Sequence, residues 1–226
     1  MLKVAPCSSK AAKVAVERWH YSGRLPVGRM RRYGVWENGE FKGVVIFSRG
    51  ASLALGHKYG LGPADCCELA RVALREHTAP VSRILRIALL LLKKAEPTMR
   101  LVVSFADPAQ GHHGGIYQAG GWIFDGDSTP SRQFYIRGRW IHNREATSGA
   151  FGGACRYSKA ERESAPSRLP PGKHRYLMWL TKADRKAHAH LAKPYPRSIS
   201  TMRQPEEEPC APVRKRQFKS DPGAPQ

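Results

Sequence analysis

The chain has 226 residues, a length that suits one domain with a sizeable core and a short appendage. Lys and Arg number 38 against 18 Asp and Glu, a formal charge of +20, and the basic residues are scattered along the whole chain. This charge predicts a polyanionic partner, with DNA or RNA first, although a charged surface can also serve solubility alone. No apolar run approaches the roughly 20 residues of a membrane span and no signal sequence is recognisable, so we expect a cytoplasmic protein without a membrane partner.

The cysteine pattern predicts neither a disulfide framework nor a structural zinc site. No two cysteines form a C-x-x-C pair, and their odd number leaves one without a partner. We therefore expect reduced thiols at Cys7, Cys66, Cys67, Cys155 and Cys210.

The first elements are predicted by periodicity and by a turn signal. Apolar positions at helical spacing, with a serine cap at 8–9, indicate a helix that ends near Trp19. Extended runs at 33–36 and 41–48 flank Asn38-Gly39, and this dipeptide supplies the positive φ angles of a two-residue hairpin.

Further along, one apolar run stands out. Residues 82–94 have helical periodicity but are too continuously apolar for a surface helix, so we expect this helix to pack on a sheet. In chain order the remaining predictions are a long loop at 49–65, a strand at 66–74, a strand at 99–106, a short helix around Tyr117, strands near 122–124 and 134–142, a loop at 149–172 with a weak helix at 157–163, a strand at 174–180 and a short helix at 185–191.

The last part of the chain differs in composition from the rest. Residues 198–226 are rich in Pro, Glu and basic residues and hold hardly any large apolar side chains, which predicts a disordered tail. From Arg197 onward the chain carries six Lys or Arg against four Asp or Glu, so nearly all of the net charge belongs to a domain spanning 1–197.

The stretch from Ser104 to Trp122 concentrates acid, imidazole and phenol groups between a buried strand and a glycine-rich helix start. The strand stops at Asp107-Pro108, which places Asp107 at its carboxyl end. A helix at 115–119 would aim Tyr117 back over the same end of the sheet. In α/β proteins such a strand-to-helix junction is where the chemistry usually lies.

This stretch resembles the Mom family of phage DNA-modification proteins, in which an Asp-Pro-x-Gln-Gly-His run is followed by Ile-Tyr-Gln-Ala and a Trp. Three further blocks match in the family's order. Residues 19–26 resemble its amino-terminal His-Tyr motif, residues 68–74 its central strand, and residues 173–176 the strand near its end.

The resemblance implies a fold and an activity. The fold is a GCN5-related N-acetyltransferase-like α/β architecture, a mixed central sheet flanked by helices, and the predicted order of elements is also typical of it. The activity is conversion of adenine in double-stranded DNA to N6-carbamoylmethyladenine, with acetyl-CoA as cofactor. Residues 1–197 would form the acetyltransferase-like domain of a phage-encoded enzyme that works in the bacterial host cytoplasm and shields phage DNA from restriction.

The acetyl-CoA site follows from the position of two elements in that fold. The strand at 66–74 would offer backbone groups to the pantetheine, and the start of the helix at 82 would offer N–H groups to the pyrophosphate. The glycine signature usual in acetyltransferases of this fold is missing at 75–82, as it is in Mom proteins, so acetyl-CoA rests on position and family. An inward arginine at 71 could instead pair with Glu68 or Asp65. The expected cofactor residues are Arg71, Val72, Ala73, Leu74, Ser82 and Arg83.

The expected catalytic residues are His20, Tyr21, Asp107 and Tyr117, brought to one cleft by the two family motifs. Taken singly, each could be a structural histidine or a core tyrosine with a satisfied hydroxyl. As a metal set, His20, Asp107 and Tyr117 combine imidazole, carboxylate and phenolate, which suit iron better than zinc. The adjacent imidazoles at 112–113 point about 100° apart on a helix, so a DNA contact suits them better than joint chelation.

Adenine N6 is paired inside the duplex and must be extruded or met in an open state, at a cost of a few kcal/mol. Arginines and aromatics are the expected tools, although any one of them can simply be solvated. We expect a phosphate-binding rim from Arg24, Arg29, Arg31 and Arg32, and from Arg132, Arg137, Arg139 and Arg144, which alternate with Phe134, Tyr135 and Trp140.

Two other functions fit parts of the sequence. A conventional N-acetyltransferase would share the fold, and the missing glycine signature disfavours it. A non-enzymatic DNA-binding protein would need only the basic surface. The residues predict no particular oligomeric state.

Overall fold

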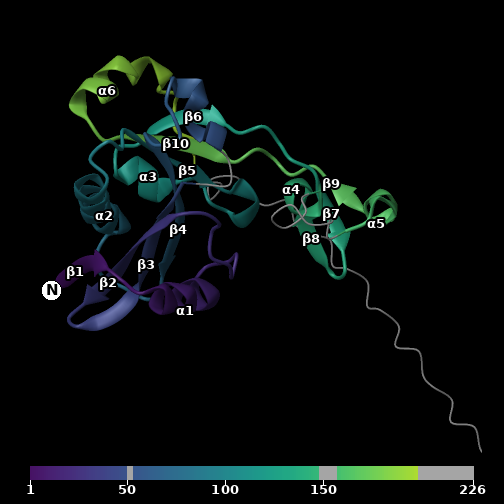
Figure 1. Cartoon of the computed structure of the whole chain (residues 1–226), viewed down its shortest axis with the longest axis horizontal. Coiled ribbons are helices and arrows are strands. Elements are labelled where there is room, and N and C mark those ends of the chain that lie inside the picture. Colours follow the sequence, from purple (N-terminus) through teal and green to yellow (C-terminus); the bar gives the residue numbers. More distant parts are fainter. Residues whose placement is uncertain (50–52, 148–156, 198–226) are drawn as a thin grey trace, which may run out of the picture.

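The computed structural model describes residues 1–49, 53–147 and 157–197. Its main body is a twisted central sheet with helices on both faces (Figure 1). β4 and β5 run parallel, and the other neighbouring strands run antiparallel. In spatial order the strands are β1 (Leu2–Pro6), β2 (Met30–Glu37), β3 (Glu40–Ser48), β4 (Cys66–Leu74), β5 (Leu101–Ala106), β10 (His174–Trp179) and β6 (Ile123–Asp127).

One face of the sheet is covered by α1 (Ser9–Trp19) and the 3-10 helix η1 (Leu53–Tyr59). The Ser8 hydroxyl caps α1 by accepting a hydrogen bond from the N–H of Ala11. Small side chains let this helix lie close to the strands, and Ala12, Ala15 and Val16 are fully buried.

The other face is covered by α2 (Val81–Ala95) and the short α3 (Gly115–Ala119). α2 connects β4 to β5, and this crossover helix allows the two strands to run parallel. β5 in turn leads to α3. Apolar positions of α2 recur along the face toward the sheet, and the buried ones are Ile84, Leu85, Ala88, Leu89 and Leu92. This sheet and its layers confirm the expected GCN5-related N-acetyltransferase-like class.

A second, small sheet lies beside the central one, at the right of Figure 1. It has its own core, built around Ile136, Ile141, Ala146 and Tyr157. Its elements are β7 (Gln133–Ile136), β8 (Arg139–His142), β9 (Ser167–Arg168), α4 (Asn143–Thr147) and α5 (Lys159–Ser164).

Several predicted elements are confirmed, among them α1, the hairpin with positive φ at Asn38 and Gly39, β4 and α2. The predicted single strand at 134–142 is wrong, because positive φ angles at Arg137 and Gly138 turn it into the β7–β8 hairpin. A turn that begins with arginine gives little sequence signal.

Other differences are local. The edge strand β1 was not predicted, and η1 forms inside the predicted loop at 49–65. β5 begins two residues later than predicted, and the helix predicted at 185–191 is split into α6 (Lys182–Ala187) and η4 (Ala189–Leu191). Parts of the predicted loop at 149–172 and the whole predicted tail at 198–226 lie outside the described residues. In the ranges that the structure describes, no helix is long and apolar enough to cross a membrane.

The β4–β5 ladder is short, and this positions the site. It runs from Cys66 opposite Leu101 to Glu68 opposite Val103, although β4 continues to Leu74. Beyond that pair, a cavity opens that is lined by residues of both strands.

Candidate active site

The cavity between β4 and β5 has a volume of about 740 Å³. The cavity is lined by the carboxyl end of α1, by the outer half of β4 with the segment that leads into α2, by the glycine-rich segment from β5 into α3, and by Lys173 before β10. The polar side chains among its lining residues are His20, Tyr21, Glu68, Arg71, His77, His112, His113, Tyr117 and Lys173.

A β-bulge in β4 decides which side chains of that strand reach the site. Opposite β3, Phe47 pairs with Leu69 but Ile46 pairs with Arg71, so Ala70 is the extra residue. Because opposite residues of antiparallel strands point to the same face, Leu69 lies on the α2 face and Arg71 on the α1 face. The bulge therefore brings Arg71 to the same face as Glu68.

Arg71 is held by backbone carbonyls. Its guanidinium donates to the carbonyl oxygen of Ala70 at 2.6 Å and to that of Arg24 at 3.1 Å. Burial lowers its pKa, and the nearby Tyr21 and Glu68 oppose that shift. No ion pair joins Arg71 to Glu68 or Asp65 within the described ranges, so the guanidinium is positioned without a carboxylate clamp.

His20 lies at the end of α1 and stacks on Tyr21, with ring centroids 4.4 Å apart. Its Nδ1 accepts a hydrogen bond from the Ser22 N–H at 3.1 Å and lies 2.8 Å from the Ser22 hydroxyl. Burial first, then the positive charge of Arg71, lowers its pKa to about 4. His20 is thus neutral at pH 7, with its proton on Nε2 because Nδ1 is the acceptor.

Tyr117 projects from α3 and is buried. Its hydroxyl lies 2.8 Å from the Ser104 Oγ, and Ser104 lies 2.9 Å from the carbonyl oxygen of Leu69. The carbonyl can only accept, so Ser104 donates its single proton to Leu69 and accepts from Tyr117. Burial raises the pKa of Tyr117 to about 12, and the phenol stays protonated.

Asp107 lies at the carboxyl end of β5 as predicted, but it lines a different, neighbouring cavity of about 600 Å³. Its side chain accepts from the Ala109 N–H at 3.1 Å and forms an ion pair with the Lys173 Nζ at 3.0 Å. Phe105 and Lys173 line both cavities. The structure therefore brings His20 and Tyr117 to one cavity and places Asp107 across a shared wall.

The predicted iron set does not fit this arrangement. The Tyr117 hydroxyl is engaged with Ser104, Asp107 with Lys173, and the Nε2 of His20 carries the proton that a metal would have to replace. No group of three or more His, Cys, Asp or Glu that could hold a metal occurs in the part of the chain that the structure describes.

The predicted cofactor residues divide between two sides of α2. Arg71, Val72 and Leu74 line the β4–β5 cavity, and the side chain of Ala73 is buried against α1 instead. Val81, the first residue of α2, also lines the cavity. Ser82 and Arg83 line another cavity, which residues of α2 share with residues of α3 and β10.

The start of α2 suits an anion. Pro80 precedes the helix and, within the described residues, no side chain caps it. The first-turn N–H groups of a helix have no intrahelical acceptor, and the helix dipole adds positive potential there.

Sequence reasoning missed Glu68 as a site residue. The carboxylate accepts no hydrogen bond from the described residues, and burial raises its pKa against the opposing charges of Arg71 and Lys173. A charged residue within the strand predicted at 66–74 was the available signal, but it was interpreted only as a partner for Arg71.

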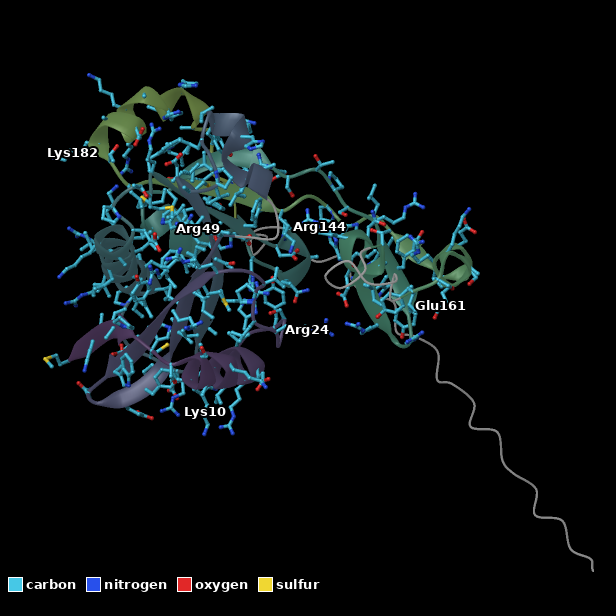
Figure 2. All side chains as sticks on the ribbon, viewed as in Figure 1. Lys10, Arg24, Arg49, Arg144, Glu161 and Lys182 are labelled. Carbon is cyan, nitrogen blue, oxygen red and sulfur yellow. The ribbon has the colours of Figure 1, made fainter. Side chains whose placement is uncertain are left out.

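The arginines predicted to form the DNA rim have different environments. Arg137 and Arg139 form ion pairs within the small sheet, each at 2.9 Å, with Glu161 and Glu145. Arg31 is the closest of the arginines around Glu96, at 2.6 Å. Arg132 and Arg144 have no acidic partner among the described residues. Figure 2 shows Arg24 and Arg144 where the two sheets meet.

Comparison with known proteins decides the family. A model of the Mom protein family matches residues 1–197. The chain belongs to the Mom protein family. The Mom protein of Escherichia phage Mu, named "Methylcarbamoylase mom", is 27% identical over 204 residues, which cover 87% of this chain and 84% of that protein.

Similar solved structures are acetyltransferases. An aminoglycoside acetyltransferase, AAC(6')-Ib, in complex with coenzyme A and kanamycin is 12% identical and has a TM-score of 0.47, covering 84% of this Mom family chain and 99% of its own. The spermidine N-acetyltransferase from Vibrio cholerae in complex with CoA and spermine is 8% identical with a TM-score of 0.45, covering 80% and 96%.

Proposed function

We propose that this protein is an enzyme that uses acetyl-CoA to convert adenine in DNA to N6-carbamoylmethyladenine. The observation that carries the proposal is the β4–β5 cavity, which gathers a carboxylate, a neutral imidazole and a buried phenol in a chain of the Mom family. The name of the phage Mu relative, a methylcarbamoylase, supports the same product.

The cavity supports acetyl-CoA as the cofactor. A volume of about 740 Å³ accommodates the acyl end and part of the pantetheine, with Leu69 and Val72 as apolar walls. Val81 carries the cavity to the uncapped start of α2, where the pyrophosphate would find N–H groups. Because residues 75–82 contain no glycine, the helix start itself has to supply this contact.

The product sets what the site must do. Simple acetyl transfer would attach N6 to the carbonyl carbon, but carbamoylmethylation attaches N6 to the former methyl carbon and turns the carbonyl into an amide. The methyl carbon must lose a C–H bond to an oxidant from outside this chain, and an amide nitrogen must displace the thiol of coenzyme A at the carbonyl carbon. When N6 forms its new bond to carbon, it loses one proton.

Glu68 is the residue of this chain that we assign to that proton. A carboxylate whose pKa is raised by burial is a better base near neutral pH than an exposed one. His20 is uncharged, and its Nε2–H can donate a hydrogen bond to the cofactor or to the base. Tyr117 holds the cavity wall through Ser104 and keeps its own proton.

The setting follows from the family. We assign catalysis to a domain formed by residues 1–197, acting on phage DNA in the cytoplasm of the bacterial host. Host restriction enzymes would then no longer recognise DNA sites that contain the modified adenine. The high positive charge of the chain supports DNA as the substrate.

Mass spectrometry of nucleosides from DNA co-expressed with the protein tests the proposal. We expect deoxyadenosine that carries the carbamoylmethyl mass. Deoxyadenosine with an acetyl mass would show a conventional N-acetyltransferase, and unmodified nucleosides together with tight DNA binding would show a non-enzymatic DNA-binding protein.

A further inference from the structure

The neighbouring cavity of about 600 Å³ lies between the central sheet and the small sheet. Its lining comes from η1, the end of β5, the β6–β7 segment, β8 with the residues after it, and the β9–β10 segment. An ion pair between Arg24 and Glu145, at 3.2 Å, ties the loop after α1 to α4 near this junction. The cavity is therefore a defined feature of the fold between two tied bodies.

The lining is cationic. Lys58 and Arg175 both contact the buried carboxylate of Asp125, and Lys173 pairs with Asp107. Arg144 adds a charge without an acidic partner among the described residues. These cations, together with the hydroxyls of Ser128, Thr129 and Ser131, can donate hydrogen bonds to phosphate oxygens.

This cavity adjoins the catalytic one. Phe105 and Lys173 line both, so a ligand in the cationic cavity lies next to the side chains that surround the acyl group. Phe105 offers a ring and Lys173 a charge at this shared wall. A nucleotide held by its phosphates in the cationic cavity would bring its base to that wall, beside the catalytic cavity.

Exposed aromatic rings continue the surface. Gln133 and His142 line the cavity and lie opposite each other in the β7–β8 hairpin. Two positions along on the same face, Tyr135 and Trp140 are 44% and 39% exposed, with ring centroids 5.3 Å apart. The guanidinium of Arg168 lies 4.2 Å from the Trp140 ring centroid. The alternate side chains fill the core of the small sheet, so these partly exposed rings lie on its outer face, with Arg168 over one face of Trp140.

We propose that the cationic cavity and the Tyr135–Trp140 pair together bind the acceptor DNA strand. Arg144 contacts phosphate, unstacked bases stack on the aromatic pair, and the target nucleotide turns into the cavity toward Phe105 and Lys173. The occupant is DNA with at least one base out of its stack. Aromatic rings bind the faces of bases, and in a closed duplex these faces are already stacked on one another. This inference rests on the proposed function for the identity of the acceptor.

The test measures binding of fluorescein-labelled DNA, single-stranded and duplex, by anisotropy over a range of salt concentrations. The variants are Arg144→Ala, Trp140→Ala and Tyr135→Ala, and the control is Lys10→Ala, which removes one charge from α1, away from both cavities (Figure 2). Circular dichroism and acetyl-CoA calorimetry verify that each variant is folded and keeps its cofactor site.

Arg144→Ala should lower the slope of log affinity against log salt by about 0.9 on duplex DNA, the value for one phosphate contact. Trp140→Ala and Tyr135→Ala should each weaken single-stranded DNA binding roughly tenfold, as expected for a lost stacking platform. Their binding to polyphosphate, which has no bases, should not change. Lys10→Ala should bind like the wild type.

Folded variants that bind DNA as the control does would overturn the inference, and if the wild type still modifies adenine the proposed function stands. Variants that lose DNA binding while the wild type modifies no adenine would support the inference and overturn the proposed function. If Trp140→Ala does not fold, Tyr135→Ala decides between these results.

Discussion

The hydroxyl of Tyr117 lies 2.8 Å from the Oγ of Ser104, and Ser104 in turn donates to the carbonyl of Leu69 on the neighbouring strand. These two hydrogen bonds begin where the β4–β5 ladder ends at Glu68. They therefore join α3, β5 and β4 at the edge of the β4–β5 cavity. They hold the two strands together at a point beyond the backbone hydrogen bonds of the ladder.

Removing that hydroxyl should stop catalysis and leave the fold. Tyr117→Phe keeps the buried ring and loses one hydrogen bond, at a cost of about 1 kcal/mol of unfolding free energy. We expect adenine modification to disappear in nucleoside mass spectrometry while the thermal transition stays cooperative. The control is Tyr33→Phe, a buried tyrosine whose hydroxyl has no hydrogen-bond partner among the described residues. Full activity in Tyr117→Phe would remove Tyr117 from the site.

Glu68→Gln should lower the activity and raise the stability of the folded protein. Without the carboxylate the rate of modification should fall by about 100-fold or more, the range of general base catalysis. Burial raises the pKa of Glu68 in the folded state, so the folded protein is disfavoured once this group ionises. The variant should therefore melt higher than the wild type at pH 7, and the difference should vanish below the unfolded pKa, where both side chains are neutral. Equal melting at both pH values would contradict the assignment.

The pH profile of the wild type follows from the same residues. A base must be deprotonated, so modification should decline as the pH falls through the raised pKa of Glu68. His20 titrates near pH 4 and adds no change near neutrality. A decline that persists unaltered in Glu68→Gln would assign the base elsewhere.

Asp107→Asn probes the shared wall of the two cavities. The amide oxygen can still accept from the Ala109 N–H, but the ion pair with Lys173 is lost. We expect modification to fall, because Lys173 loses the carboxylate that holds it at the wall shared by the two cavities. Stability should change little, because a partly exposed pair contributes about 1 kcal/mol at most. Asp107→Ala loses the turn contact as well and should be less stable than Asp107→Asn. Normal activity in Asp107→Asn would show that its charge is not needed.

Ser82→Glu tests the pyrophosphate contact. A carboxylate in the first turn of α2 would occupy the N–H groups that the cofactor needs, and we expect roughly tenfold weaker acetyl-CoA binding in calorimetry. Ser9→Glu places the same charge in the first turn of α1 and should leave cofactor binding unchanged. An unaltered affinity in Ser82→Glu would show that acetyl-CoA does not bind at the start of this helix.

Truncation after Arg197 tests the domain boundary. The removed residues carry almost no net charge, so folding, modification and the salt dependence of DNA binding should match the full chain. A clearly shallower salt slope in the truncated protein would reveal a DNA arm around Arg214 and Arg216.

The elements that the sequence could predict are those set by local chemistry. Asn38-Gly39 specifies its turn, and the apolar stripe of α2 specifies its buried face. The grouping of Tyr21 with Tyr117 was predictable only from the family motifs, because the two come from elements that meet through tertiary packing. Nothing local indicates that Asp107 points away from the β4–β5 cavity, since this depends on its ion pair with Lys173, the residue just before β10.

The bulge at Ala70 determines which side chains of β4 share a face of the sheet. Glu68 and Arg71 are an odd number of positions apart, and in a regular strand they would point to opposite faces of the sheet. If β4 kept all its residues but paired regularly with β3, every side chain would keep its identity, yet the carboxylate and the guanidinium would point to opposite faces. In this strand the backbone register determines the chemistry as firmly as the residue types do.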